Sequence, residues 1–256
     1  GIPLVELIDT SAKKPQALVL APTRELCVQI ENDLKAFSAK TKHFYTVAVY
    51  GGANIRTQID QLRKGVQVVV ATPGRLIDLL GRRAVDLSQI KYLVLDEADE
   101  MLNMGFQEDI DEILSTTPKE KVTWLFSATM PTEIKSISKK FMKSPMEISA
   151  GNVNQTNANI EHQYYLVQPK NKYAALKRIL DYNPDIYGII FCRTKAETQE
   201  IADKLIKDGY NADSLHGDLS QMQRDKVMLA FRERTLQMLI ATDVAARGID
   251  IDNLTH

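Results

Sequence analysis

The fold is decided by the stretch ALVLAPTRELCVQIENDLKAF, which runs from Ala17 to Phe37. Its first five residues form an apolar run of strand length, and the residues after them place Leu26, Ile30 and Leu34 at helical spacing. The same alternation of an apolar run and an amphipathic stretch recurs along the chain. It predicts an α/β protein built from crossover units, with mostly parallel sheets and helices on both faces.

The alternation fails once, between residues 149 and 159, where the sequence is SAGNVNQTNAN. This polar, Asn-rich segment has no periodicity and predicts a linker at residues 151–159. The domains expected on its two sides are residues 1–150 and 160–256. After the linker the alternation resumes with an apolar run at Tyr164 to Val167 and a helix from about Lys172 to Leu180.

The two sides of the linker resemble one another. The segment LVLAPTRE from Leu18 is echoed by IIFCRTKAE from Ile189, and VVVATPGR from Val68 is echoed by MLIATDVAARG from Met238. A chance match is the alternative, because any parallel sheet contains short apolar runs, but the shared order favours two copies of one fold. Ligands bind at the carboxyl ends of strands in open α/β sheets, so functional sites are expected on the facing edges of two similar domains.

Composition sets further limits. The chain is 44% apolar and 25% charged, as in ordinary globular proteins. Its 32 basic and 33 acidic side chains nearly cancel, so a nucleic-acid partner would have to be held by local sites. Cys27 and Cys192 form no CxxC motif and predict a reduced, cytoplasmic protein. No apolar run approaches the roughly 18 to 20 residues that span a bilayer.

The strongest local signal is YLVLDEAD, from Tyr92 to Asp99, an apolar run that ends in adjacent carboxylates. A magnesium nucleotide site needs this arrangement: Asp96 would hold Mg²⁺ through its water shell, and Glu97 would polarise the attacking water. The alternative is a solvated helix start, where acidic residues favour the helix dipole.

Other motifs follow in a fixed order. They are Pro22-Thr-Arg-Glu-Leu26, Gly51-Gly52, Thr72-Pro-Gly-Arg75, Asp96-Glu-Ala-Asp99, Ser127-Ala-Thr129, His216-Gly-Asp218 and Ala241-Thr-Asp-Val-Ala-Ala-Arg-Gly-Ile-Asp250. With these motifs the whole chain resembles the DEAD-box RNA helicases. The resemblance implies two RecA-like domains, both truncated here, that use ATP and Mg²⁺ to bind and unwind RNA without sequence preference.

Each motif also has a chemical reading. Thr72, Pro73, Gly74 and Arg75 lie where a strand turns into a helix, so backbone N–H groups can face an RNA phosphate. A plain turn is the alternative for Gly51 and Gly52. The resemblance assigns contacts with single-stranded RNA to Pro22, Thr23, Arg24, Gly51, Gly52, Thr72, Pro73, Gly74 and Arg75 in the first domain, and to Arg193, Thr194, Gln221, Arg224 and Thr242 in the second.

The resemblance implies the remaining roles. The hydroxyls of Ser127 and Thr129 would hydrogen-bond to the carboxylates of the motif from Asp96 to Asp99 and couple nucleotide state to domain closure. A helix cap before Pro131 is the other reading, and both can be true. Asp243, Gly248 and Asp250 would reach ATP from the second domain. His216 is expected to be a structural or coupling residue.

Two expected parts of such a motor are missing from the 256 residues. No Gly-rich loop with Gly-Lys-Thr occurs, and neither does the His-Arg-x-x-Arg-x-x-Arg motif of the family. The chain is therefore expected to be a fragment without ATPase activity of its own. A non-catalytic RNA clamp or regulatory fragment is the rival hypothesis, and a DNA-directed helicase is a weaker one. The RNA target cannot be read from the sequence.

Overall fold

A computed structural model describes residues 1–149, 160–246 and 251–256. The chain divides into two compact units, Gly1–Ser149 (unit 1) and Ala150–His256 (unit 2). The expected linker at residues 151–159 and the candidate residues Gly248 and Asp250 lie outside the described residues. None of the helices in the described ranges is both long and apolar enough to cross a bilayer.

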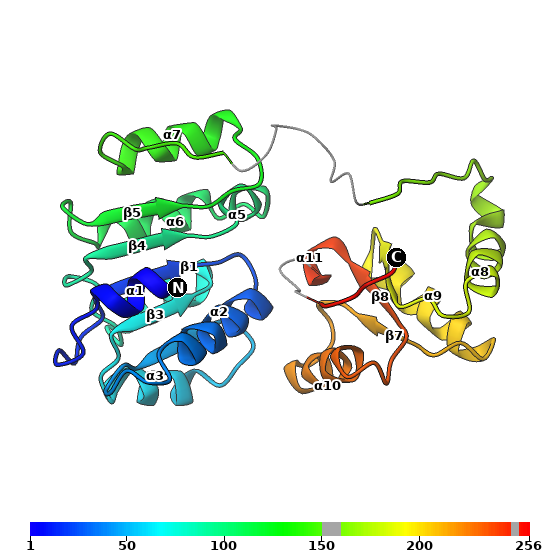
Figure 1. The fold of residues 1–256 in the computed structure, drawn as a ribbon, viewed down its shortest axis with the longest axis horizontal. Coiled ribbons are helices and arrows are strands. Elements are labelled where there is room, and N and C mark those ends of the chain that lie inside the picture. Colours follow the sequence, from blue (N-terminus) through cyan, green and yellow to red (C-terminus); the bar gives the residue numbers. More distant parts are fainter. Residues whose placement is uncertain (150–159, 247–250) are drawn as a thin grey trace. The chain divides into compact units, whose positions relative to one another are not determined.

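Unit 1 is a five-stranded parallel sheet in the order β2-β3-β1-β4-β5 (Figure 1). Its elements are α1 (Ile2–Leu7), β1 (Ala17–Leu20), α2 (Arg24–Phe37), β2 (Thr46–Val49), α3 (Ile55–Arg63), β3 (Val68–Ala71), α4 (Pro73–Gly81), β4 (Tyr92–Leu95), α5 (Ala98–Asn103), α6 (Gln107–Ser115), β5 (Val122–Leu125) and α7 (Thr132–Phe141).

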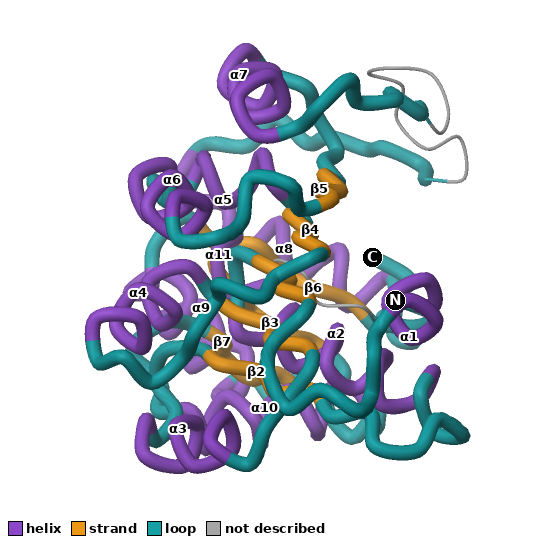
Figure 2. The backbone as a smooth tube through the Cα atoms, turned by 90° about the vertical axis from the view of Figure 1, so that its left-hand side faces the viewer, coloured by secondary structure: helices purple, strands orange, loops and turns teal. Residues whose placement is uncertain are grey.

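Alternate strand residues of unit 1 face opposite helix layers, as the two-residue period of a strand requires. Ala17 and Val19 of β1 pack with α1 and α2, whereas Leu18 and Leu20 pack with the layer of α3 to α7. Figure 2 shows α1 and α2 on one side of the unit 1 strands, with α3, α4 and α6 on the other. Strands buried on both faces explain the continuous apolar runs in the sequence.

Unit 2 has a three-stranded parallel sheet in the order β6-β8-β7. Its elements are η1 (Pro169–Asn171), α8 (Lys172–Tyr182), β6 (Gly188–Cys192), α9 (Lys195–Lys207), β7 (Ala212–Leu215), α10 (Gln221–Arg232), β8 (Met238–Thr242) and α11 (Asp243–Ala246). Helices α8 and α9 pack on one face of this sheet, and α10 and α11 pack on the other.

The α/β class with parallel sheets and helices on both faces is confirmed. One expected element is wrong: the apolar run from Tyr164 to Val167 is not a strand. It has no strand partner among the described residues, and Leu166 is 92% exposed. A strand needs a hydrogen-bonded neighbour, and an apolar pattern alone does not supply one.

Candidate nucleotide and RNA site

The candidate residues of unit 1 gather at one edge of its sheet. In the parallel register Leu20 lies beside both Ala71 and Leu95, and Val49 also lies beside Ala71. The residues that follow these four strands therefore emerge at the same carboxyl edge. This edge brings together the segments that begin at Pro22, Gly51, Thr72 and Asp96.

The acidic pair follows β4 directly. Glu97 has a left-handed backbone, with φ 47° and ψ 52°, and it is the N-cap residue of α5. A non-glycine residue in this conformation is strained, and such strain is concentrated at functional sites. The Oδ1 atom of Asp96 accepts the backbone N–H of Glu97 at 3.1 Å.

Asp96 is half-buried, and burial raises the pKa of its carboxyl group, while the backbone N–H of Glu97 acts in the opposite direction. It lines a cavity of about 510 Å³ together with Asp33, Trp124 and Phe126. A carboxylate whose charge is incompletely compensated fits a nearby cation. No cluster of three or more potential metal ligands occurs among the described residues.

Asp99 joins α5 to the segment that follows β5. Its Oδ2 atom accepts the Thr129 hydroxyl at 2.6 Å and the Thr129 backbone N–H at 3.0 Å. Its own N–H donates to the Ser127 hydroxyl, which donates to the Thr129 carbonyl at 2.7 Å. Burial acts to raise the pKa of Asp99, but hydrogen bonding by Thr129 and Ser127 outweighs it and lowers the pKa.

Arg24 and the two glycines form one compact surface. The guanidinium of Arg24 lies so close to Gly52 that a Cβ there would stand 2.2 Å from Nη1. Gly52 also has φ +87°, where other residues are strained. Thr23 caps α2, because its side chain accepts the N–H of Leu26. Pro22 precedes this cap.

Arg75 reaches the same glycine turn from α4. Its Nη1 donates to Oε1 of Gln58 at 2.8 Å, and both terminal nitrogens donate to the Ala53 carbonyl at 3.3 Å. Gln58 is buried and donates to the Tyr50 carbonyl at 3.1 Å. Arg75 and Gln58 therefore hold both ends of the glycine turn. Sequence reasoning missed Gln58, because a lone glutamine in an amphipathic helix carries no local signal.

The segment from Thr72 to Gly74 begins α4, with Pro73 in the first turn and no side-chain cap hydrogen bond from Thr72. The first-turn N–H groups of a helix have no intrahelical acceptors, so they are suited to an anion. This geometry is compatible with the expected phosphate contact.

Unit 2 repeats part of this arrangement. Cys192 lies beside Thr242 in the register of β6 and β8, so the residues after both strands share a carboxyl edge. Thr194 caps α9 by accepting the N–H of Glu197, and the Thr242 hydroxyl accepts the N–H of Ala245. Asp243 opens α11.

The remaining unit 2 candidates are less accessible or already engaged. Arg224 is only 7% exposed, and Gln221 donates to Asp225 at 2.8 Å on the same helix. Arg193 is exposed, and its backbone N–H donates to Glu197. Their roles toward RNA stay predictions.

His216 is buried, and its Nε2 lies 3.0 Å from Oε1 of Gln199, which also accepts the Ser214 hydroxyl. This contact ties β7 to α9. The geometry supports a structural role for the histidine.

The sequence of the chain matches models of known protein families. A DEAD/DEAH box helicase family model matches residues 1–137, and a helicase conserved C-terminal domain model matches residues 171–256. The whole chain is 44% identical to the ATP-dependent RNA helicase DeaD of Mycobacterium tuberculosis (strain ATCC 25618 / H37Rv), covering 45% of that protein. It is also 44% identical to the DEAD-box ATP-dependent RNA helicase CshA of Bacillus subtilis (strain 168), covering 52%. The chain thus spans about half the length of these relatives.

Solved structures of similar proteins have the same fold. A DEAD box protein from the hyperthermophile Methanococcus jannaschii is 43% identical, with a TM-score of 0.56; the match covers 98% of this chain and 67% of that one. S. cerevisiae Dbp5 bound to RNA and ADP BeF3 is 30% identical, with a TM-score of 0.86; the match covers 98% of this chain and 63% of that one. Both sheets of the chain therefore have counterparts of the RecA-like type.

Proposed function

Because the chain belongs to the DEAD/DEAH box helicase family, we propose that the protein containing it is an ATP-dependent RNA helicase. It binds the backbone of single-stranded RNA and separates short duplexes in a cycle of ATP binding and hydrolysis. Residues 1–150 form the first RecA-like domain, residues 151–159 connect it, and residues 160–256 form the second. Its location is the cytoplasm, in keeping with the free, buried Cys27 and Cys192.

The hydrogen-bonded link between Asp99 and Thr129 carries this proposal. It joins the helix that begins at the acidic pair to the segment after β5, with two hydrogen bonds to one carboxylate oxygen. Any displacement of the acidic pair is thereby transmitted to the segment from Ser127 to Thr129. Charge-assisted hydrogen bonds of this kind are among the stronger ones in proteins, which suits a coupling element.

The acidic pair supplies the chemistry. Bound Mg²⁺ would neutralise phosphate charge, and Asp96 would hold it through water. Glu97 would accept a proton from the attacking water. Its strained backbone fixes the start of α5 and so fixes where its carboxylate is presented. Asp243, with Gly248 and Asp250, would complete the ATP contacts from the second domain.

RNA would be bound by backbone N–H groups and cationic side chains of the protein. Arg24, Gly52 and Arg75 form one surface with the open N-terminus of α4, and these groups recognise phosphate rather than bases. Arg193, Thr194, Gln221, Arg224 and Thr242 would supply the counterpart in the second domain. Binding should therefore depend strongly on salt and weakly on RNA sequence.

The 256-residue chain by itself should not hydrolyse ATP appreciably. It contains no Gly-Lys-Thr loop and no His-Arg-x-x-Arg-x-x-Arg motif, and an arginine that stabilises the transferring phosphate contributes factors of about 10³ to 10⁵ in rate.

The test is a Glu97→Gln substitution in the protein with its natural flanks. We expect turnover to fall by about 10² to 10⁴ while RNA affinity is retained, because general-base catalysis is worth about that much. Glu120→Gln is the matched control, since Glu120 is an exposed carboxylate of unit 1 at the opposite end of its sheet. Normal turnover by the Glu97 variant would refute the assignment. RNA binding without any turnover by the unsubstituted protein would favour the RNA clamp.

A further inference from the structure

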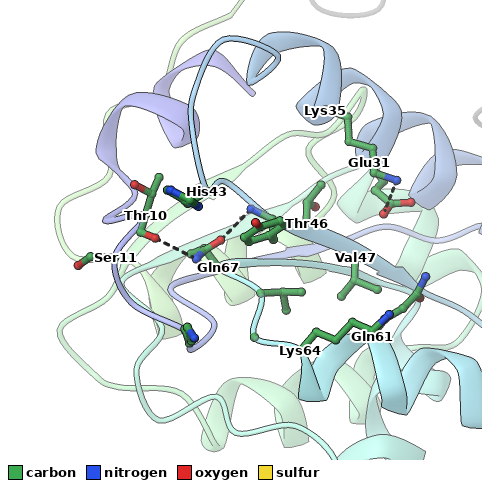
Figure 3. A pocket seen from close by; sticks show the side chains of 14 residues that line it. Thr10, Ser11, Glu31, Lys35, His43, Thr46, Val47, Gln61, Lys64 and Gln67 are labelled. Carbon is green, nitrogen blue, oxygen red and sulfur yellow. Dashed lines mark hydrogen bonds and ion pairs between the residues drawn. The ribbon is translucent and has the colours of Figure 1, made fainter.

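Unit 1 has a second pocket at the edge of the sheet opposite the acidic pair. It lies where β2 and β3 begin, beside Tyr45 and Gln67, and its volume is about 760 Å³ (Figure 3). Pockets of this size hold small-molecule ligands. It shares no lining residue with the candidate nucleotide and RNA site.

The wall of this pocket is fixed by a buried amide. Gln67 is 1% exposed; its Nε2 donates to the carbonyls of Thr10 and Ala12, and its Oε1 accepts the N–H of Tyr45. The turn at Gly65 packs equally closely, since a Cβ there would stand 2.9 Å from Cβ of Lys13. A ligand would therefore meet a preformed site with little ordering cost.

Donors and positive charge surround the opening. Lys13, Lys35 and Lys64 line it against a single carboxylate, Glu31, which is paired with Lys35 at 2.8 Å. In the described part of the chain Lys13 and Lys64 have no ion-pair partner. Figure 3 shows Glu31 and Lys35 of α2 on one side of the pocket, with Lys64 on the other. This charge balance selects an anion.

A buried polar atom also lacks a partner at this site. The hydroxyl oxygen of Thr46 is buried and makes no hydrogen bond within the described residues, yet Thr46 lines the pocket. That oxygen has no surface accessible from the pocket, so Thr46 contributes only the rest of its side chain to the lining. His43 lies near Thr10 at the far end and offers a further donor (Figure 3).

The lining also includes one aromatic and two aliphatic side chains. Tyr45 is 54% exposed, and the buried Val47 and Val66 lie beside it. An exposed aromatic ring is a surface on which a base can stack. We propose that this pocket binds a nucleoside monophosphate unit, with the phosphate at Lys13 and Lys64 and the base against Tyr45. This site is independent of the function proposed above.

There is a simpler reason for two of the cations. Lys35 and Lys64 lie at the C-terminal ends of α2 and α3, where positive charge stabilises the helix dipole. Lys13 belongs to no helix, so that explanation does not apply to it. Replacing Lys13 therefore separates a binding role from helix stabilisation.

The experiment is calorimetric and NMR titration of the 256-residue chain with uridine 5′-monophosphate, inorganic phosphate and uridine. We expect the monophosphate to bind about tenfold tighter than either part alone, with shifts at the amides of Tyr45 and Gln67. Lys13→Glu and Lys64→Glu should each weaken binding about tenfold, and Lys119→Glu, an exposed control in the same unit, should leave it unchanged. Tyr45→Ala should weaken monophosphate binding but not phosphate binding.

A 5′-phosphorylated RNA tetranucleotide identifies the source of the ligand. Tighter binding than the monophosphate would assign the pocket to an RNA end, and equal or weaker binding would assign it to a free nucleotide. The proposal is overturned if the monophosphate shows no saturable binding, or if binding survives both Lys13→Glu and Lys64→Glu in variants with the unchanged fold.

Discussion

Unit 1 and unit 2 share the order of three parallel strands, but they carry different candidate residues. Three strands are ordered β2-β3-β1 in unit 1 and β7-β8-β6 in unit 2, the same order once the strands are taken in chain sequence. The first strand of each set is followed by a capping threonine, Thr23 or Thr194. This equivalence confirms that the sequence echoes reflect one repeated fold rather than chance.

The difference lies in β4 and β5, which the described residues of unit 2 do not match. These strands carry Asp96 and Glu97 at one end and lead into Ser127 and Thr129. The comparison teaches that the repeated strands of the two units supply equivalent strand ends, whereas in the described part of the chain the acidic pair and its hydroxyl partners follow β4 and β5 of unit 1.

The most severe test of two separate units is loss of one core. Phe231 is fully buried in unit 2, and its ring centroid lies 4.7 Å from that of Tyr187. Phe231→Ala should cost about 3 to 5 kcal/mol, because the cavity forms inside a small core. Hydrogen exchange should show lost protection in unit 2 only.

Leu229→Ala is the control for that change, since Leu229 lies on the same helix but is exposed, and its cost should stay within about 0.5 kcal/mol. Equal loss of protection in both units after Phe231→Ala would contradict the claim that the two units are stabilised separately.

A smaller effect concerns a feature of unit 1 alone. Arg75→Ala should lower the free energy of unfolding of unit 1 by about 1 to 3 kcal/mol, because the buried Gln58 loses its partner. Chemical denaturation followed by Trp124 fluorescence would measure this. Arg82→Ala, which removes only an exposed pair with Asp78 on the same helix, should cost about 0.5 kcal/mol or less. Equal costs for the two substitutions would show that the hydrogen bonds of Arg75 to Gln58 and Ala53 contribute little to the stability of unit 1.

The two capping threonines offer a matched pair across the units. Thr23→Ala and Thr194→Ala should each cost about 1 kcal/mol in their own unit, because one helix N–H loses its acceptor. Serine at either position should restore most of the loss. Thermal unfolding with hydrogen exchange would report both. A cost at Thr23 with none at Thr194 would indicate that the caps are not equivalent.

The finest distinction is between two carboxyl groups of unit 1. Asp96 should titrate above its ordinary pKa because of burial, and Asp99 below it because hydrogen bonding by Thr129 and Ser127 outweighs burial. Asp99 therefore stabilises the folded state at neutral pH, and this contribution is lost as pH falls below about 4 through its folded pKa. The contribution of Asp96 to stability has the opposite pH dependence, since protonation removes the cost of burying its negative charge. Carboxyl carbon NMR would measure both midpoints, and an Asp99 midpoint above that of Asp96 would contradict the assignment.

Much of the fold was predictable because periodicity reports burial directly. The apolar run from Ala17 predicted β1, the helical spacing of Leu26, Ile30 and Leu34 predicted α2, and the helix expected from about Lys172 to Leu180 is α8. The run from Tyr164 to Val167 was not predictable in the same way, because its state depends on a pairing partner elsewhere in the chain.

The site was predictable only in part. Strand-final residues such as Asp96 and Thr72 could be placed at one edge from the topology alone. Gln58 could not, because its role depends on contacts with Tyr50 and Arg75 that exist only after folding. The pocket near Gln67 was equally hidden, since its lining comes from segments far apart in the sequence that only the fold brings together.

The most direct test of the account is ATP hydrolysis by the protein extended through its natural flanks, with and without single-stranded RNA, and with the 256-residue chain as control. We predict RNA-stimulated turnover by the extended protein and none by the control. Absence of turnover from the folded, RNA-binding extended protein would contradict the account and assign the two units to an RNA clamp.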